Sequence, residues 1–271
     1  MKQFFSIDDV DDLTELLKEA VEVKRNPFSD KGSIKNKSIC LLFLNPSLRT
    51  RLSSQRAGQN LGVDVTVFDV GAGGWQLEFS DGAIMNGNKV EHIKEAAAVI
   101  GTYFDLVAIR AFAKLEDRDQ DNSEQILSQF IKHCPVPVVN LESSTRHPLQ
   151  AFADLITIET HKKEEKPKVV LTWAPHPKAL PQAVANSFSL WTQKAKYDLT
   201  ITQILSEDKN WMIDETKMKL TNQAKFMHCL PARRNVVVSD AVIDSENSLV
   251  IEEAGNRIVS AQTIFKKLLS Q

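Results

Sequence analysis

The chain is poor in cysteine and has no long apolar run. Its 271 residues include three cysteines, Cys40, Cys134 and Cys229, which are widely spaced and form no CxxC pair. This spacing argues against a disulfide framework and against a zinc site, and it fits a reducing compartment. No apolar run approaches the length of a membrane span, and Asp8 and Asp9 interrupt the N-terminal segment before a signal-peptide core forms. We therefore expect a cytoplasmic protein without a membrane span.

The chain also has no large excess of positive or negative residues. The chain carries 33 lysines and arginines against 35 aspartates and glutamates, a formal net charge of −2 at pH 7. Without a large basic field, a nucleic-acid partner is not expected, and any anion site must come from a local cluster of cations. The 42% of hydrophobic and 25% of charged residues are typical of a globular protein, and 271 residues exceed the usual size of one domain. We therefore expect two domains.

Short β-rich runs alternate with helical patterns along the chain. Several runs are nearly continuous in Val, Ile, Leu and Phe, as expected for parallel strands that are covered on both faces. The alternation predicts an α/β fold with doubly wound sheets. The expected strands are Ile39–Leu44, Val63–Val70, Leu106–Arg110, Val136–Leu141, Val169–Trp173, Leu199–Thr202, Phe226–Leu230 and Leu249–Ile251. The expected helices are Asp8–Lys24, Ser47–Leu61, Val90–Thr102, Ser123–His133, Pro148–His161, Pro181–Gln193 and Arg257–Leu269.

A domain boundary is expected near residues 143–150, where a cap-like run precedes Pro148, a residue suited to the first turn of a helix. Four of the expected strands precede this boundary and four follow it. The second half has fewer strand–helix units than a doubly wound domain normally needs. We therefore expect that a loop is missing from the chain between Gln203 and Ile204.

The segment Asn45–Arg51 (NPSLRTR) follows a buried-type strand and opens a helix. The N-terminal end of a helix is positive and favours acidic residues, but this one carries Arg49, Arg51 and Arg56. Cations at such an end cost free energy unless an anion lies among them. Hydroxyl donors at positions 47 and 50 complete a phosphate-binding pattern, with a basic, solvated helix start as the alternative.

Two further clusters of polar residues, and one arginine in an apolar strand, also lie at a helix start or at the end of a strand. Arg146–Gln150 (RHPLQ) begins another helix, where His147 can donate to a carbonyl oxygen and the glutamine can hydrogen-bond an amide. His228–Arg234 (HCLPARR) ends an expected strand, and open α/β sheets bind ligands at the carboxyl ends of their strands. Arg110 ends an apolar strand, where an unpaired charge is costly. Taken singly, each also fits a structural role: a helix cap, a small buried hydrophobe or an ion pair.

Taken together, these clusters resemble the transcarbamylase family, that of aspartate and ornithine transcarbamylases. The segment at 45–51 looks like the family's Ser-x-Arg-Thr-Arg motif, and the other two clusters contain His-Pro-x-Gln and His-Cys-Leu-Pro. The resemblance covers essentially the whole chain, including the order and spacing of the motifs. It implies two doubly wound domains with parallel sheets: residues 1–146 bind carbamoyl phosphate, residues 147–256 bind an acyl-ornithine, and the C-terminal helix 257–271 packs back on the first domain.

The resemblance also implies a role for each site residue. The catalytic residues would be Thr50, Arg110 and His147, which polarise the carbonyl group and stabilise the tetrahedral oxyanion. Carbamoyl phosphate would be held by Ser47, Leu48, Arg49, Thr50, Trp75, Arg110, His147, Gln150, Cys229, Leu230 and Arg257. The acceptor would be positioned by Glu142, His176 and Arg233.

No metal or organic cofactor is implied by this resemblance. The acceptor amine has a pKa near 10 when free, so it must lose a proton before it attacks, and the phosphate itself is a candidate for the base. Trp75 is implied to enter the site of a neighbouring subunit in a homotrimer. These expectations describe an enzyme of two small-molecule substrates that associates with copies of itself.

Three details of the sequence indicate which acceptor substrate the resemblance implies. The Asn45–Arg51 segment, the Gly74–Trp75 pair followed by Met85–Asn88, and the doubled arginine at 233–234 resemble the branch that acts on N-acylated ornithine. The succinyl enzymes look nearest, which implies N-succinyl-L-ornithine as the acceptor and N-succinyl-L-citrulline and phosphate as products, in arginine biosynthesis. The N-acetylornithine enzymes are the alternative. Val90 stands where the succinyl branch has proline and the acetyl branch has glutamate.

Departures from the family leave other readings open. Relatives carry an additional stretch before the Ile204 region, containing a lysine that contacts substrate, and it is missing here. A catalytically inactive, ligand-binding homologue is one alternative, and the intact motifs argue against it. A Rossmann-type nucleotide-binding protein is another, but the glycine-rich turn Gly71–Gly74 lacks the GxGxxG spacing.

Overall fold

The computed structural model describes residues 1–70, 75–174, 179–202 and 211–271. A four-stranded parallel sheet in the order β2-β1-β5-β6 forms the centre of the first half. Its strands are β1 (Ser38–Phe43), β2 (Asp64–Asp69), β5 (Leu106–Arg110) and β6 (Val138–Glu142). The three strands β1, β5 and β6 are buried almost throughout, which explains their continuous apolar sequences. The edge strand β2 alternates between exposed and half-buried residues.

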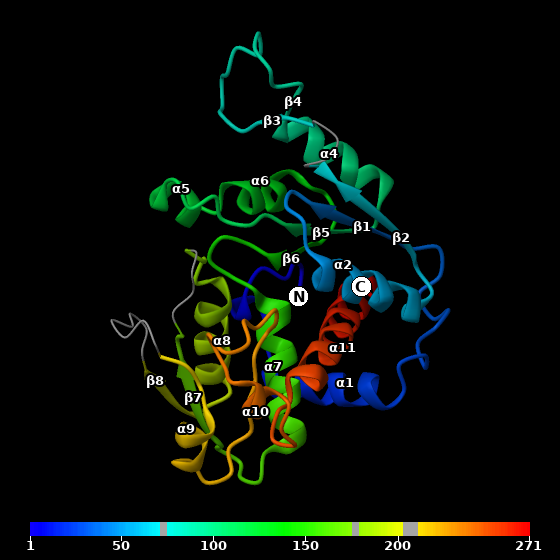
Figure 1. Ribbon diagram of the computed structural model, residues 1–271. Helices are drawn as coiled ribbons and strands as arrows, with labels where there is room; N and C mark the ends of the chain where they lie inside the picture. Colours follow the sequence, from blue (N-terminus) through cyan, green and yellow to red (C-terminus); the bar gives the residue numbers. More distant parts are fainter. Residues whose placement is uncertain (71–74, 175–178, 203–210) are drawn as a thin grey trace.

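Helices cover both faces of this sheet (Figure 1). Successive residues of a strand point to opposite faces, so Leu41 and Phe43 enter one core and Cys40 and Leu42 the other. The first core is covered by α1 (Leu13–Arg25), α2 (Leu48–Leu61), α7 (Pro148–His161) and α11 (Val250–Leu269). The second is covered by α4 (Ile93–Tyr103) and α6 (Gln125–His133). Packing of α2 on the sheet therefore fixes the position of its N-terminus relative to the C-terminal end of β1.

The second half contains a two-stranded parallel sheet of β7 (Lys168–Thr172) and β8 (Asp198–Thr202), connected through α8 (Ala183–Lys194). Two short helices, α9 (Glu215–Lys219) and α10 (Asp240–Ile243), follow. The smaller elements of the first half are η1 (Ile7–Asp9), β3 (Leu77–Glu78), β4 (Glu91–His92) and α5 (Arg118–Asn122). The β3–β4 pair and its connecting loop project away from the rest of the molecule (Figure 1).

The C-terminal helix α11 joins the two halves. It packs against α1 and α2 of the first half and against α7, the helix that follows the expected domain boundary. This placement confirms that the C-terminal helix packs back on the first half of the chain, and the fold is the expected α/β class with parallel sheets. The division at residues 146 and 256 remains a prediction. Within the described ranges, no helix combines the length and the apolar character needed to cross a bilayer.

Two expected strands are wrong. Phe226–Leu230 contributes an isolated bridge between Phe226 and Ser248 rather than a strand. The run at 249–251 is the beginning of α11, which starts at Val250. Its buried residues continue at 253, 256, 257, 260 and 261, a helical period that outweighs three apolar residues in a row. The first expected helix also begins later, because Asp12 caps α1 by accepting from the Glu15 N–H at 3.0 Å.

Candidate active site

The N-terminus of α2 lies at the centre of the site and is poorly neutralised by its own residues. Ser47 is the N-cap, but its side chain makes no capping hydrogen bond, and the first turn contains no acidic residue. The Nε of Arg49 is buried and has no hydrogen-bond partner within the described part of the chain. The start of α2 therefore offers free backbone N–H groups, the Ser47 hydroxyl and the Arg49 guanidinium as donors, a set suited to an anion.

Arg257 reaches this helix end from α11. Its Nη2 donates to Thr50 Oγ1 at 2.6 Å, and both side chains are buried. Burial lowers the pKa of Arg257, and the nearby charge of Arg49 acts in the same direction. A second cation is thus held beside the uncapped turn, and it adds to the positive charge that this helix end presents to an anion.

Arg110 stands at the end of β5 and borders the same helix start. Its Nε donates to Glu142 Oε2 at 2.9 Å, and its Nη1 donates to the carbonyls of Asn45 and Pro46, each at 3.2 Å. The guanidinium carbon lies 4.9 Å from the centre of the Phe112 ring. These contacts supply the ion pair that a buried arginine requires and fix the loop that leads into α2.

His147 is the N-cap residue of α7, beside which Pro148 occupies the first turn. Its ring is buried, with Nε2 lying 3.7 Å from Glu142 Oε2 and 3.5 Å from Arg257 Nη2. Burial first, and then the charges of Arg257 and Arg110, hold the pKa of His147 well below its usual range. The imidazole is therefore neutral at pH 7, a form with one N–H donor that can polarise a carbonyl oxygen.

Gln150 lies one turn further along α7 and is completely buried. Its amide nitrogen donates to Asp154 Oδ1 at 2.7 Å and to Glu253 Oε1 at 3.1 Å. Its Oε1 is buried and accepts no hydrogen bond from the described residues. The glutamine therefore keeps a free acceptor, which can take a hydrogen bond from an amide N–H.

The His228–Leu230 segment closes the same region. The backbone N–H of His228 donates to Glu253 Oε2 at 2.8 Å, and the N–H of Leu230 donates to His228 Nδ1 at 2.9 Å. Burial and then the charge of Arg49 lower the pKa of His228, which links this segment to the helix start of α2. Burial raises the pKa of the Cys229 thiol to about 12, so it remains protonated and is not a nucleophile at neutral pH.

The remaining expected residues lie around this cluster or outside it. Leu48 is 69% exposed at the first turn of α2. Trp75 donates from Nε1 to Glu91 Oε2 at 2.8 Å and packs edge-on against Phe68, both within its own chain. Arg233 is exposed beyond the cis Leu230–Pro231 bond. His176 lies outside the described residues. Ser47, Arg49, Thr50, Arg110, Glu142, His147, Gln150, Cys229, Leu230 and Arg257 are the expected residues that the fold gathers from distant parts of the chain.

Three residues of the site escaped the sequence analysis. Asp154 and Glu253 are buried acids that hold Gln150, and the spacing of four residues between Gln150 and Asp154 on one helix was the available signal. Glu124 accepts from the Ser143 and Thr145 hydroxyls and from the Thr145 N–H, which shapes the turn before His147. Glu124 lies about twenty residues before this turn in the sequence, so no local pattern indicated the contact.

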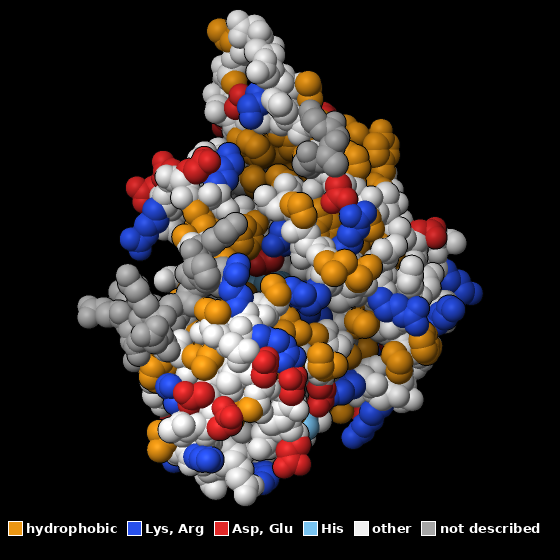
Figure 2. Space-filling view, viewed as in Figure 1, with side chains coloured by type: hydrophobic (Ala, Val, Ile, Leu, Met, Phe, Trp, Pro, Cys, Tyr) orange, Lys and Arg blue, Asp and Glu red, His pale blue; other side chains and the backbone are white. Residues whose placement is uncertain are grey.

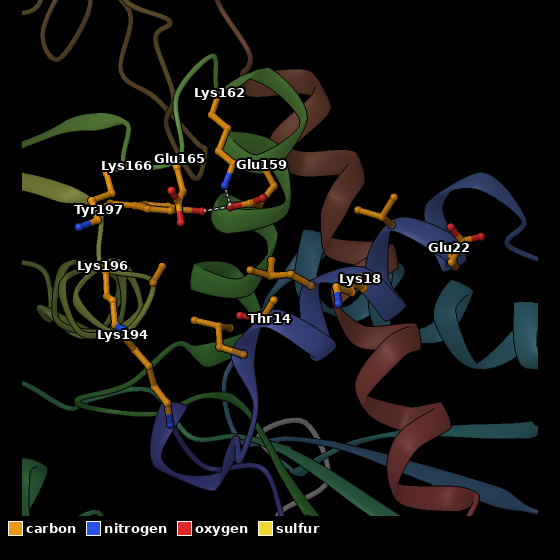
Figure 3. Close-up of a pocket in the computed structure, with 14 residues that line it drawn as sticks. Thr14, Lys18, Glu22, Glu159, Lys162, Glu165, Lys166, Lys194, Lys196 and Tyr197 are labelled. Carbon is orange, nitrogen blue, oxygen red and sulfur yellow. Dashed lines mark hydrogen bonds and ion pairs between the residues drawn. The ribbon is translucent and has the colours of Figure 1, made fainter.

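The space-filling view shows a hollow between the upper and lower halves of this face of the molecule, with basic and acidic side chains at its base (Figure 2). A separate cavity of about 660 Å³ lies between α1, the end of α7 and the turn after α8. Figure 3 shows Thr14 and Lys18 on one side of it and Glu159, Lys162 and Tyr197 on the other. None of the expected site residues that the structure describes lines this cavity, so it is distinct from the arginine cluster.

Known families match both halves of the chain. The model described as aspartate/ornithine carbamoyltransferase, carbamoyl-P binding domain, matches residues 2–160. The model described as aspartate/ornithine carbamoyltransferase, Asp/Orn binding domain, matches residues 121–268. The chain belongs to the aspartate/ornithine carbamoyltransferase family. It is a carbamoyltransferase, and its arginine cluster lies within the part matched by the carbamoyl-phosphate-binding model, apart from Arg257.

Individual carbamoyltransferases support the same assignment. N-succinylornithine carbamoyltransferase of Bacteroides fragilis (strain 638R) is 44% identical, with 99% of each chain covered. N-acetylornithine carbamoyltransferase of Xanthomonas axonopodis pv. citri (strain 306) is 35% identical, with 96% of this chain and 94% of the relative covered. A crystal structure of acetylornithine transcarbamylase complexed with acetylcitrulline is 33% identical and covers 100% of both chains with a TM-score of 0.91.

The carbamoyltransferase relatives are longer than this chain. The alignment with the Bacteroides fragilis enzyme runs over 314 positions, against 271 residues here, so the relative has positions that this chain lacks. The expected junction at Gln203 and Ile204 lies outside the described residues, and its place stays a prediction.

Proposed function

We propose that this carbamoyltransferase transfers the carbamoyl group of carbamoyl phosphate to the δ-amine of N-succinyl-L-ornithine, as a step of arginine biosynthesis in the cytoplasm. The observation that supports carbamoyl phosphate as the first substrate is the cluster of the half-buried Arg49 with the buried Arg110 and Arg257 at the uncapped N-terminus of α2. The 44% identity to N-succinylornithine carbamoyltransferase supports the acceptor.

In the proposed complex, the phosphate of carbamoyl phosphate occupies the start of α2. Ser47 and the N–H groups of the first turn donate to its oxygens, and Arg49 opposes its charge. The carbonyl oxygen faces Arg110 and His147, with Thr50 as a further donor. These groups stabilise the oxyanion as negative charge develops on it. Because the imidazole is neutral, its contribution is a hydrogen bond rather than a full charge.

We place the amino group of the carbamoyl moiety between Gln150 and the backbone of Cys229 and Leu230, which form the two walls of an amino-group site. The unpartnered Oε1 of Gln150 accepts one of its hydrogens, and the backbone carbonyls of Cys229 and Leu230 accept the other. The neutral δ-amine then forms a C–N bond to the carbonyl carbon, and the C–O bond to phosphate breaks. The departing phosphate takes the proton that the amine loses. Much of the rate enhancement then comes from positioning and electrostatics.

Val90, which is 65% exposed on the segment before β4, favours the succinyl group because it carries no acid. The acetyl branch has glutamate at this position, and a carboxylate there would repel the second carboxylate of a succinyl group. A mutant of N-acetyl-L-ornithine transcarbamylase in which a glutamate is replaced by valine was crystallised with carbamyl phosphate and N-succinyl-L-norvaline, and it superposes on this chain with a TM-score of 0.88. Glu142 and Arg233, with His176, are proposed to position the acceptor.

A homotrimer is proposed as the active assembly. Apolar side chains are exposed on the projecting β3–β4 loop, where Ile84 is 84% exposed, and on the first turns of α2, where Leu52 is 56% exposed. Contact between such surfaces of neighbouring subunits would bury both and bring Trp75 towards a second site.

A substrate panel tests the proposed function. Purified protein receives carbamoyl phosphate with N-succinylornithine, N-acetylornithine, ornithine or aspartate, and the ureido product is measured. We expect the highest kcat/KM with N-succinylornithine. Preference for N-acetylornithine would overturn the succinyl assignment alone, whereas no product with any acceptor would favour the inactive, ligand-binding homologue.

A further inference from the structure

Beneath the proposed carbamoyl site lies a pair of buried acids that the reaction itself does not use. Asp154 of α7 is 4% exposed and Glu253 of α11 is 2% exposed. The two carboxyl groups are hydrogen-bonded to each other, and both accept from the amide of Gln150, at 2.7 Å and 3.1 Å. Acids buried this deeply are rare unless they serve a specific contact.

We propose that Asp154 and Glu253 are positioning residues that share one proton and thereby make the site selective for the amino group of carbamoyl phosphate. This inference rests on the proposed placement of the carbamoyl group against Gln150. The two acids set the direction of the Gln150 amide and the position of the neighbouring backbone.

The direction of the amide follows from hydrogen-bond chemistry. Carboxylate oxygens accept hydrogen bonds, so the two N–H bonds of Gln150 must face Asp154 and Glu253, and the amide oxygen must face away from them. A reversed amide would set its oxygen against the acids and leave its hydrogens unpaired. The acids thus leave Oε1 as a buried acceptor without a partner in the described chain, an arrangement that is costly until a donor binds.

The same pair also fixes the second wall of the proposed amino-group site. Glu253 Oε2 accepts from the His228 N–H at 2.8 Å, and His228 Nδ1 accepts from the Leu230 N–H at 2.9 Å. The carbonyls of Cys229 and Leu230 are therefore anchored to the carboxyl group that orients Gln150. Movement of Glu253 would disturb both walls at once.

Sharing of a proton keeps the pair stable in its buried place. Two adjacent carboxyl groups cannot both ionise at low cost, and burial raises the pKa of Asp154 to about 6 and that of Glu253 well above its usual range. The groups that face the pair are Arg257 on α11 and, on the segment after β8, the His228 N–H and the Cys229 thiol. Two carboxyl groups can hydrogen-bond to each other only through a proton, so the pair holds one proton in this arrangement, and its loss at alkaline pH would leave two like charges side by side.

Acetyl phosphate provides the discriminating probe, because it replaces the amino group of carbamoyl phosphate by a methyl group of similar size. The measurement is the Km of carbamoyl phosphate and the competitive inhibition constant of acetyl phosphate, with N-succinylornithine as acceptor. In Glu253→Ala and Asp154→Ala we expect affinity for carbamoyl phosphate to fall about tenfold or more, and that for acetyl phosphate to change less than about twofold. Glu252→Gln is the matched control, since Glu252 is the preceding residue of α11 but pairs with Lys24 and His161 at the surface.

Asp154→Asn separates positioning from a merely structural role. Its amide oxygen can accept from Gln150 and its amide nitrogen can donate to Glu253, so we expect the affinity for carbamoyl phosphate to stay within about threefold of wild type. Because no proton is then shared, the alkaline fall in kcat/KM that the pair causes in wild type should disappear. The pH profile of kcat/KM for Asp154→Asn can be measured even if the alanine variants fail to fold.

Two results would overturn the inference. One is an equal loss of affinity for carbamoyl phosphate and acetyl phosphate in every folded variant, and the other is an unchanged alkaline limb in Asp154→Asn. Failure of the proposed function looks different, since the wild-type protein would then form no ureido product with any acceptor.

Discussion

Arg257 on the last helix donates to the hydroxyl of Thr50 on α2 at 2.6 Å, across 207 positions of the chain. This contact places a cation from the end of the sequence at the helix start that the first motif forms. It also means that the site is complete only when α11 is docked, so that the anion site and the fold of the C-terminal part depend on each other.

The coupling of these two residues is a measurable quantity. In a double-mutant cycle with Thr50→Val and Arg257→Lys, we expect a coupling free energy of about 1–2 kcal/mol in kcat/KM for carbamoyl phosphate, because the hydrogen bond is buried and charge-assisted. Circular dichroism controls for loss of structure. Additive effects of the two changes would mean that the contact contributes nothing to the site.

Arg49 tests the phosphate assignment. Arg49→Ala should lower kcat/KM by about a hundredfold or more, since it removes a guanidinium whose Nε has no partner in the described chain. The melting temperature should remain close to that of wild type. Arg56→Ala, on the same helix, is the control: Arg56 is exposed and lies over the Phe28 ring, and its loss should leave activity within about twofold. Equal losses in both variants would contradict the assignment.

The buried imidazole of His147 makes stability depend on pH. Its pKa is lowered well below the ordinary value of 6.5, so below that pH the unfolded chain binds a proton that the folded protein does not. Stability conferred by this residue is therefore full above about pH 6.5 and is lost at up to about 1.4 kcal/mol per pH unit as the pH falls. Urea unfolding between pH 5 and 7 should show a shallower dependence in His147→Gln than in wild type, and equal slopes would sink this account.

Val90 is expected to set the acyl preference. Val90→Glu should lower kcat/KM for N-succinylornithine about ten- to a hundredfold relative to N-acetylornithine, because the new carboxylate repels the succinyl group. Ile84→Glu introduces the same charge on the same projecting loop and should leave the ratio unchanged. A ratio that shifts equally in both variants would assign the effect to general charge.

The sequence predicted most strands of the sheets closely, because buried parallel strands are nearly continuous in apolar residues. It also predicted the helices α2 and α7 closely, because Ser47 and Pro148 are residue types typical of a helix start. It also named all three arginines of the cluster, Arg49, Arg110 and Arg257, the last through the family resemblance alone. It misread Leu249–Ile251 as a strand, because three apolar residues have no visible period until the helix continues beyond them. Glu253 escaped for a related reason: in sequence it is one acid among several, and only packing of α11 against α7 reveals that it is buried beside Asp154.

Direct observation of the transferred carbon tests the central claim. Carbamoyl phosphate labelled with ¹³C at the carbonyl is mixed with N-succinyl-L-ornithine and catalytic amounts of the purified protein, and the reaction is followed by NMR. The account predicts that the label moves into the ureido group of N-succinyl-L-citrulline while one phosphate is released for each product formed. Label that appears only in the products of spontaneous carbamoyl phosphate breakdown, at the rate seen without protein, would contradict it.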